Sequence, residues 1–80
     1  MAMPASFTDL IDALAGGRRK RTKLAVQLGK TYWQVNYWAR INNIPEEFWD
    51  DVILLASEKN HEGVTRDYLK DLKRRKLNHG

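Results

Sequence analysis

Residues 21–40 read RTKLAVQLGKTYWQVNYWAR, and the spacing of their apolar residues indicates two helices. The first half carries apolar residues three and four positions apart, as on one face of a helix: Leu24, Ala25 and Leu28. Gly29 follows them, and a glycine commonly occupies the left-handed position that ends a helix. The second half repeats the spacing of three: Val35, Trp38 and Ile41. The stretch therefore predicts two helices, about Arg19–Leu28 and Thr31–Ile41, joined by a short turn.

The residues at the junction indicate how these two helices meet. A steep crossing brings two backbones close together and needs a small residue on the first helix, which Ala25 provides. The turn needs a residue that tolerates a positive φ, which Gly29 provides. Thr31 and Gln34 have the spacing of a capping box at the start of the second helix. The pair therefore predicts a helix-turn-helix.

Three more helices are expected around this pair. One begins after Ser6, ends at Gly16-Gly17 and has an apolar stripe: Phe7, Leu10, Ile11 and Leu14. Another has Pro45 in its first turn and carries a longer apolar set: Phe48, Trp49, Val52, Ile53, Leu55 and Ala56. The last spans Val64–Leu77, is capped by Thr65 and has its own stripe: Tyr68, Leu69 and Leu72. The predicted fold class is all-α, a compact bundle of five short helices. It forms a single domain over residues 1–80, with residues 1–5 and 77–80 expected to be flexible.

Charge is strongly segregated along the chain, although the net charge is only +4. Residues 18–40 contain seven basic residues and no acid, whereas residues 41–63 contain six acids and one base. Such segregation gives one face a positive field that favours a polyanionic partner. The alternative is a solvated basic face with no partner.

Several classes of function are excluded or disfavoured by what the sequence lacks. The chain has no cysteine and only two histidines, His61 and His79, so no metal site is expected. No phosphate-binding glycine motif occurs, and the carboxylates of residues 46–51 are expected to form a solvated face. We therefore expect no enzyme activity, cofactor or small-molecule ligand. Neither a membrane span nor a signal peptide is expected.

The segment Arg21 to Arg40 resembles the helix-turn-helix of the lambda-repressor-like family, the Cro and repressor type of small phage and bacterial regulators. With Arg21 as the first of twenty positions, the small, glycine and apolar residues match the motif: Leu24, Ala25, Leu28, Gly29, Val35 and Trp38. The helix order from Phe7 to about Ser57 and the Ile44-Pro45 step are also similar to small Cro-like regulators. Lys30 departs from the pattern, since that position is often apolar or small.

The resemblance implies sequence-specific binding of double-stranded DNA, with residues 31–41 as a recognition helix in the major groove. The side chains that it would present to bases are Thr31, Tyr32, Trp33, Gln34, Asn36, Tyr37 and Arg40. Arg40 suits guanine, and Gln34 or Asn36 suits adenine. The residues that it would present to phosphates are Arg18, Arg19, Lys20, Arg21, Lys23 and Lys30.

The aromatic residues divide between core and surface. Trp38 and Trp49 are expected in the core, whereas Trp33 lies off the apolar stripe and is expected to be exposed for function. A regulator of this type is expected in the cytoplasm, associated with the nucleoid, as a homodimer on a two-fold-symmetric operator. The last helix is the candidate dimer surface because its apolar residues exceed what a small core needs: Tyr68, Leu69, Leu72 and Leu77.

Two other functions stay open. The protein could bind DNA through charge alone as an architectural protein, or it could be a helical protein–protein interaction module, such as an antitoxin or a phage accessory protein. The second alternative uses Trp33, Tyr32 and Tyr37 as its contact surface. Only DNA binding requires the basic segment 18–23.

Overall fold

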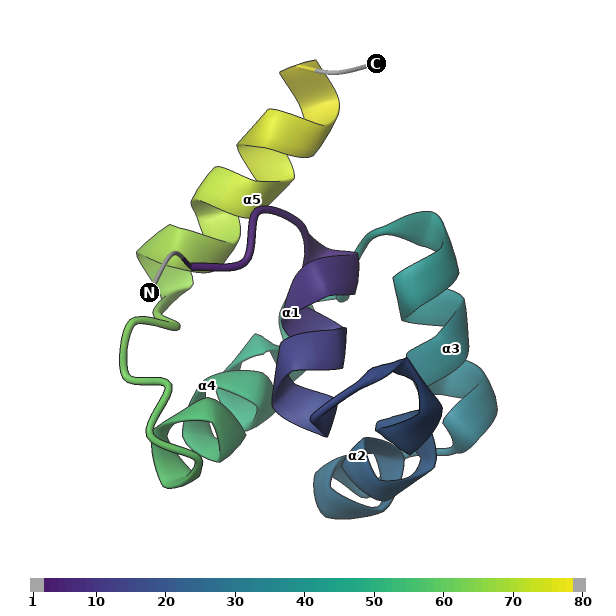
Figure 1. The fold of residues 1–80 in the computed structure, drawn as a ribbon. Coiled ribbons are helices and arrows are strands. Elements are labelled where there is room, and N and C mark those ends of the chain that lie inside the picture. The colour runs from purple at the N-terminus through teal and green to yellow at the C-terminus, as the bar shows by residue number, and fades with distance from the viewer. Residues whose placement is uncertain (1–2, 79–80) are drawn as a thin grey trace.

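The computed structural model describes residues 3–78, which form five α-helices and two 3₁₀ turns (Figure 1). The α-helices are α1 (Phe7–Ala15), α2 (Arg21–Leu28), α3 (Tyr32–Ile41), α4 (Trp49–Glu58) and α5 (Arg66–Asn78). The 3₁₀ turns are η1 (Arg18–Lys20) and η2 (Glu46–Phe48). These described residues contain no β-strand, so the all-α prediction is confirmed. The radius of gyration, 11.5 Å, matches the roughly 11.6 Å of a compact chain of this length.

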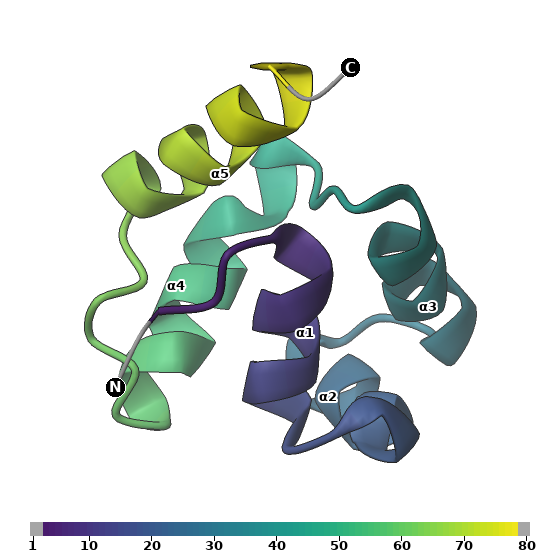
Figure 2. The ribbon, with the colours of Figure 1, turned by 45° about the horizontal axis from the view of Figure 1, so that its top comes forward.

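Helix α1 lies in the middle of the bundle and packs against both α2 and α3 (Figure 1). Helix α4 packs against α2 and α5, and α5 lies on the side of the molecule away from α2 (Figure 2). One continuous core joins the inward faces of all five helices. Its fully buried large side chains are Phe7, Leu10, Ile11, Leu24, Val35, Ile44, Trp49, Val52, Leu69 and Leu72.

The predicted helix caps are confirmed. Ser6 caps α1 by accepting a hydrogen bond from the Asp9 amide, and α1 ends at Gly16, whose φ is +85°. Helix α2 ends at Gly29, whose φ of +69° is also left-handed. Thr31 and Gln34 form a complete capping box at the start of α3. These caps satisfy backbone groups that a helix end leaves without partners.

Three helices begin later than predicted. Helix α5 begins at Arg66 instead of Val64, directly after its cap Thr65, whose hydroxyl oxygen accepts from the Tyr68 amide. The other two begin later because tighter turns precede them. The helix predicted from about Arg19 begins at Arg21, after η1, in which the Lys20 amide donates to the Gly17 carbonyl. Pro45 precedes η2 instead of entering the first turn of α4, and the Phe48 amide donates to its carbonyl. Both bonds span three residues, which gives a 3₁₀ turn in place of the first turn of an α-helix.

The two predicted core tryptophans are buried. Trp38 stacks on Phe48 with a tilt of 33° between the rings. Trp49 donates its indole N–H to the carbonyl oxygen of Ile44 at 2.8 Å. This bond satisfies a buried polar group and fixes the chain between α3 and α4.

Helix α5 uses its apolar residues inside its own bundle. Leu69 and Leu72 are buried in the core, and Tyr68 packs against it and donates its hydroxyl to the Pro4 carbonyl. The apolar surplus that singled out α5 as a dimer surface is therefore absent at these positions, and the Leu77 side chain lies outside the described residues. The flexibility predicted for residues 1–2 and 79–80 also lies outside them. No helix between residues 3 and 78 has the length and apolar character to cross a membrane.

Candidate nucleic-acid interface

Helices α2 and α3 meet through a turn of three residues, Gly29 to Thr31. The Lys30 amide donates to the Ala25 carbonyl at 2.9 Å, which closes the end of α2 behind the left-handed glycine. Ala25 and Val35 are buried where the two helices pack together. The turn and the small residue hold the first turn of α3 outside the bundle, with its opposite face in the core.

The outward face of α3 is aromatic. The side chain of Trp33 is 76% exposed, Tyr37 is 55% exposed and Tyr32 is 40% exposed. The Tyr32 and Trp33 rings meet edge to face, with centroids 5.5 Å apart. Large exposed apolar patches of this kind are often found at interaction sites of proteins. The sequence predicted the exposure of Trp33 correctly.

The polar residues expected to contact bases differ in how freely they can do so. Arg40 is exposed near the end of α3. Gln34 and Thr31 are exposed, but they bind each other's backbone amides, with 3.1 Å between each donor and acceptor. The side-chain oxygen of Gln34, Oε1, therefore already accepts a hydrogen bond in the cap. The side-chain nitrogen of Gln34 is the group that remains available to a partner. Asn36 is half-buried beside Arg21.

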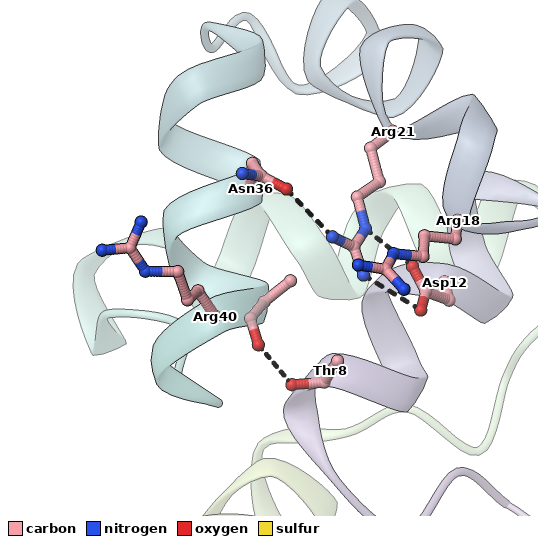
Figure 3. A pocket seen from close by; sticks show the side chains of 7 residues that line it. Thr8, Asp12, Arg18, Arg21, Asn36 and Arg40 are labelled. Carbon is pink, nitrogen blue, oxygen red and sulfur yellow. Dashed lines mark hydrogen bonds and ion pairs between the residues drawn. The ribbon is translucent and has the colours of Figure 1, made fainter.

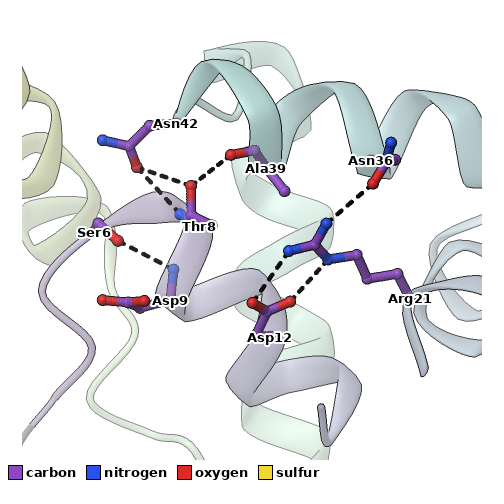
Figure 4. Close-up of polar contacts among 8 residues, drawn as sticks. All are labelled: Ser6, Thr8, Asp9, Asp12, Arg21, Asn36, Ala39 and Asn42. Carbon is purple, nitrogen blue, oxygen red and sulfur yellow. Dashed lines mark hydrogen bonds and ion pairs between the residues drawn. The ribbon is translucent and has the colours of Figure 1, made fainter. Parts of the chain in front are cut away.

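Arg21 lies in a place that the sequence analysis did not predict. Its side chain is buried, and its guanidinium donates to both carboxylate oxygens of Asp12, at 2.8 and 3.1 Å (Figure 4). A third N–H donates to Oδ1 of Asn36 at 3.0 Å. Arg21 thus joins α1, α2 and α3, and its guanidinium is occupied within the fold. The prediction that Arg21 contacts a phosphate is therefore replaced by a structural role.

A second polar link joins α1 to the end of α3. The Thr8 hydroxyl donates to the Ala39 carbonyl at 2.6 Å, and the Thr8 amide donates to Oδ1 of Asn42 at 3.1 Å (Figure 4). Asn42 has a positive φ of 54° at the C-terminal cap of α3. Neither Thr8 nor Asp12 stands out in the sequence, because their partners are 9 to 34 residues away and no local pattern signals such pairs.

Four of the remaining predicted phosphate contacts are exposed at or near the N-terminal end of α2: Arg18, Arg19, Lys20 and Lys23. Among residues 3–78, the ion pairs involve other cations, namely Arg21, Arg66 and Arg75. The four charges are therefore free of internal partners in the described part of the chain. The positive end of the helix dipole adds to their field.

Lys30 differs from these four cations. It is half-buried, and its ammonium lies 4.2 Å from the centroid of the Phe48 ring. Its aliphatic stem and charge cover one face of this aromatic ring. Lys30 therefore extends from the turn onto η2, and its charge interacts with the Phe48 ring within the protein.

A polar hollow of about 340 Å³ opens between α1, η1, α2 and α3 (Figure 3). Its lining residues are Thr8, Asp12, Arg18, Arg21, Asn36, Ala39 and Arg40. Three of them are arginines and one is an acid. The hollow lies beside the exposed face of α3 and shares Asn36 and Arg40 with it.

The acidic segment lies elsewhere, on η2 and α4. Asp50 accepts a hydrogen bond from Arg66 at 2.7 Å, and Glu46 lies 3.8 Å from the same guanidinium. Arg66 also lies over the Trp49 ring. In the described chain, no group of three or more histidine or acidic residues is placed to hold a metal ion.

No protein-family model matches the chain, and no curated protein or solved structure matches it either.

Proposed function

We propose that this protein is a small transcriptional regulator of the Cro and repressor type, which binds double-stranded DNA sequence-specifically with α3 in the major groove. The observation that carries the proposal is the 76% exposure of Trp33 on the outward face of α3, in a molecule that also exposes the cations Arg18, Arg19, Lys20 and Lys23 at and before the start of α2. The second helix of a helix-turn-helix enters the groove at its N-terminal end. Trp33 lies in the first turn of α3, where that contact is made.

The outward side chains of α3 have the chemistry that base contact requires. Tyr32, Trp33 and Tyr37 offer apolar area for thymine methyl groups and for the sugar wall of the groove. Arg40 carries an exposed guanidinium, whose two parallel donors match either the edge of guanine or a phosphate. Thr31 and the amide nitrogen of Gln34 add polar contacts. Each good bidentate pair discriminates against a wrong base by about 1–3 kcal/mol.

The exposed cations at and before the start of α2 supply contacts without sequence information. Arg18, Arg19, Lys20 and Lys23 have the charge and exposure to bind phosphates on one strand. Backbone amides at a helix N-terminus favour the same anions. These contacts would fix the register of α3 on the duplex and contribute most of the salt dependence of binding.

One α3 reads only a few base pairs, so we propose a homodimer on an inverted repeat. Its half-sites would lie one helical turn apart, roughly 34–36 Å from centre to centre. As a DNA-binding regulator, the protein would act in the cytoplasm at the nucleoid.

Selection from a random double-stranded DNA library at near-physiological salt tests the proposal. An enriched inverted repeat is the expected result. Enrichment of a single half-site would keep the sequence-specific function and remove the dimer. Gel-shift titration of the enriched duplex against a scrambled duplex then gives the specificity ratio.

Two other results would each replace the proposal. Binding without any enriched sequence that disappears as salt rises would indicate an architectural DNA-binding protein. Absence of binding even at low salt would make Tyr32, Trp33 and Tyr37 a protein-binding surface, as in an antitoxin or a phage accessory protein.

A further inference from the structure

We infer that the hollow between α1, η1, α2 and α3 is a binding site for one phosphate group, held by Arg18, Arg40 and the amide nitrogen of Asn36. Under the proposed function, on which this assignment of the source rests, the phosphate belongs to the DNA backbone. Asn36 and Arg40 thereby change from the expected base contacts to phosphate contacts. The chemistry of the site itself follows from its donors.

The orientation of the Asn36 side chain is determined by its neighbour. Oxygen and nitrogen of an amide are difficult to tell apart by shape, but the hydrogen-bond partner decides. A guanidinium only donates hydrogen bonds, so the Asn36 atom that lies 3.0 Å from Nη1 of Arg21 is the acceptor Oδ1. The Asn36 amide nitrogen therefore points the other way, away from Arg21 (Figure 3).

This orientation changes what Asn36 can recognise. Adenine is bound by an amide that donates and accepts at the same time. With Oδ1 occupied by Arg21, Asn36 offers two N–H donors and suits a partner that only accepts, such as a phosphate oxygen. Arg21 is buried and held by Asp12, so the orientation is maintained without the ligand.

The charge of the hollow favours an anion. Asp12 neutralises Arg21 through the ion pair, which leaves Arg18 and Arg40 as two uncompensated guanidinium groups in the lining. The two come from different elements, η1 and the last turn of α3. The guanidinium of Arg40 points away from Asp12 in Figure 3. Rotation about the bonds of this exposed side chain would bring the guanidinium to an anion that enters the hollow.

The hollow is large enough for a phosphate group. Its volume of about 340 Å³ is at the lower end of the roughly 300–1,000 Å³ of typical ligand sites. The Thr8 hydroxyl donates to Ala39 and is not available as a donor to the ligand. The available donors are therefore those of Arg18, Asn36 and Arg40.

The salt dependence of DNA binding tests whether these groups hold the same phosphate. The variants are Arg18→Gln, Arg40→Gln and the double variant, with Lys59→Gln at the far end of α4 as a charge-matched control. The slope of log K against log salt changes by about 0.9 for each phosphate that the protein no longer neutralises. The double variant is expected to reduce the slope by about 0.9. A reduction of about 1.8 would mean two separate phosphates and would overturn the shared site.

A near-isosteric variant tests Asn36 without removing its internal hydrogen bond. Asn36→Asp keeps an acceptor for Arg21 and replaces the two outward donors by an acceptor. We expect an unchanged melting temperature and at least tenfold weaker binding of the selected DNA. A wild-type affinity with an intact fold would overturn the role of Asn36.

Titration with inorganic phosphate separates this inference from the proposed function. Amide resonances of residues 18, 36 and 40 are followed by NMR in the wild type and in Asn36→Asp. One outcome is that the protein binds no DNA, and that phosphate shifts these resonances in the wild type but not in Asn36→Asp. The phosphate site is then supported, with free phosphate groups as its ligands. If the protein binds DNA and the slope is the same in wild type and double variant, the inference fails and the proposed function stands. If neither DNA nor phosphate binds, both fail.

Discussion

The guanidinium of Arg21 binds the carboxylate of Asp12 through two hydrogen bonds, with Nε and Nη2 at 2.8 and 3.1 Å from the two oxygens. The Arg21 side chain is 8% exposed and that of Asp12 is 29% exposed. A planar two-point contact fixes angle as well as distance. Because Nη1 also binds Asn36, one side chain sets the position of α3 relative to α1 and α2.

Replacing Arg21 by methionine should destabilise the fold. The change leaves the Asp12 carboxylate and Asn36 Oδ1 without their donor in a partly buried place. Removing a hydrogen bond to a charged group costs about 1.5–3 kcal/mol, and we expect the free energy of unfolding to fall by an amount in that range. Urea unfolding followed by circular dichroism measures it. The double variant Asp12→Leu/Arg21→Met should regain part of the loss, since it removes both charges. A fully stable Arg21→Met would show that the network contributes nothing.

Gly29 should tolerate asparagine better than alanine. Its φ of +69° is left-handed, and no atom beyond the adjacent backbone lies within 4 Å of the position that a Cβ would take. The cost of a side chain is therefore backbone strain alone, about 1–2 kcal/mol for alanine. Asparagine adopts this conformation more readily and should cost less. Chemical denaturation of the two variants side by side checks the order, and equal losses would contradict it.

Replacement by phenylalanine should destabilise the fold more at Trp49 than at Trp38, because only Trp49 has a hydrogen bond that the substitution removes. Both substitutions remove a similar volume from the core. Only Trp49→Phe also leaves the Ile44 carbonyl without its indole donor. An unsatisfied buried acceptor costs about 1–3 kcal/mol, and we expect the loss of unfolding free energy in Trp49→Phe to exceed that in Trp38→Phe by that amount. Thermal and urea unfolding give the difference, and a larger loss in Trp38→Phe would refute it.

Alkaline pH should weaken the fold through Tyr68. Burial raises the pKa of its hydroxyl above the ordinary 10.0; Arg75 opposes the rise and Asp9 adds to it. A raised pKa in the folded state means that the stabilising contribution is complete below pH 10. It is lost as the pH rises through the folded-state pKa. The comparison is with Tyr68→Phe, which keeps the ring and lacks the hydroxyl that titrates.

The stability of Tyr68→Phe should therefore depend less on pH above 10 than that of the wild type. At neutral pH the variant should be slightly less stable, because it lacks the hydrogen bond to Pro4. Melting temperatures from pH 8 to 11 test both points. Parallel curves for the two proteins would remove Tyr68 as the cause.

Trp33→Ala should separate function from stability. The side chain is mostly exposed, so the free energy of unfolding should change by no more than about 0.5 kcal/mol. If α3 binds DNA as proposed, removal of the indole ring should weaken binding of the selected DNA by tenfold or more, with less effect on a scrambled duplex. Gel shifts on both duplexes measure this. Trp38→Ala is the matched contrast, since it should lose several kcal/mol of stability and lose DNA binding only as a result.

The fold was predictable from sequence because its signals are local. Caps at Ser6 and Thr31 and the glycines 16 and 29 each act within a few residues, so the ends of the helices could be predicted. The apolar spacing of three and four also determined which faces are buried. The predicted start of α2 was wrong by two residues and that of α4 by about a turn, because 3₁₀ turns, which are frequent at helix ends, precede both helices.

The candidate site was less predictable because its polar pairs connect distant residues. Arg21 has the charge and position of a phosphate contact, and only Asp12, nine residues earlier, makes it structural. The ammonium group of Lys30 also has a partner within the fold, the ring of Phe48. The exposure of Trp33 could be predicted because it depends only on the position of Trp33 relative to the apolar residues of its own helix. It cannot give the partners of long charged side chains, which depend on how the helices pack.

The different exposure of the three tryptophans makes the intrinsic fluorescence of the protein sensitive to what covers α3. Trp38 and Trp49 are shielded from solvent, whereas the Trp33 indole is open to it and sits at the tip of the outward face of α3. A soluble quencher such as iodide should therefore quench the red-shifted emission of the exposed Trp33 and leave the emission of Trp38 and Trp49. Any partner that covers α3 would protect Trp33 from the quencher, whether it is a duplex or another protein. Occupancy of this face can therefore be followed in unlabelled protein, before the partner's identity is known.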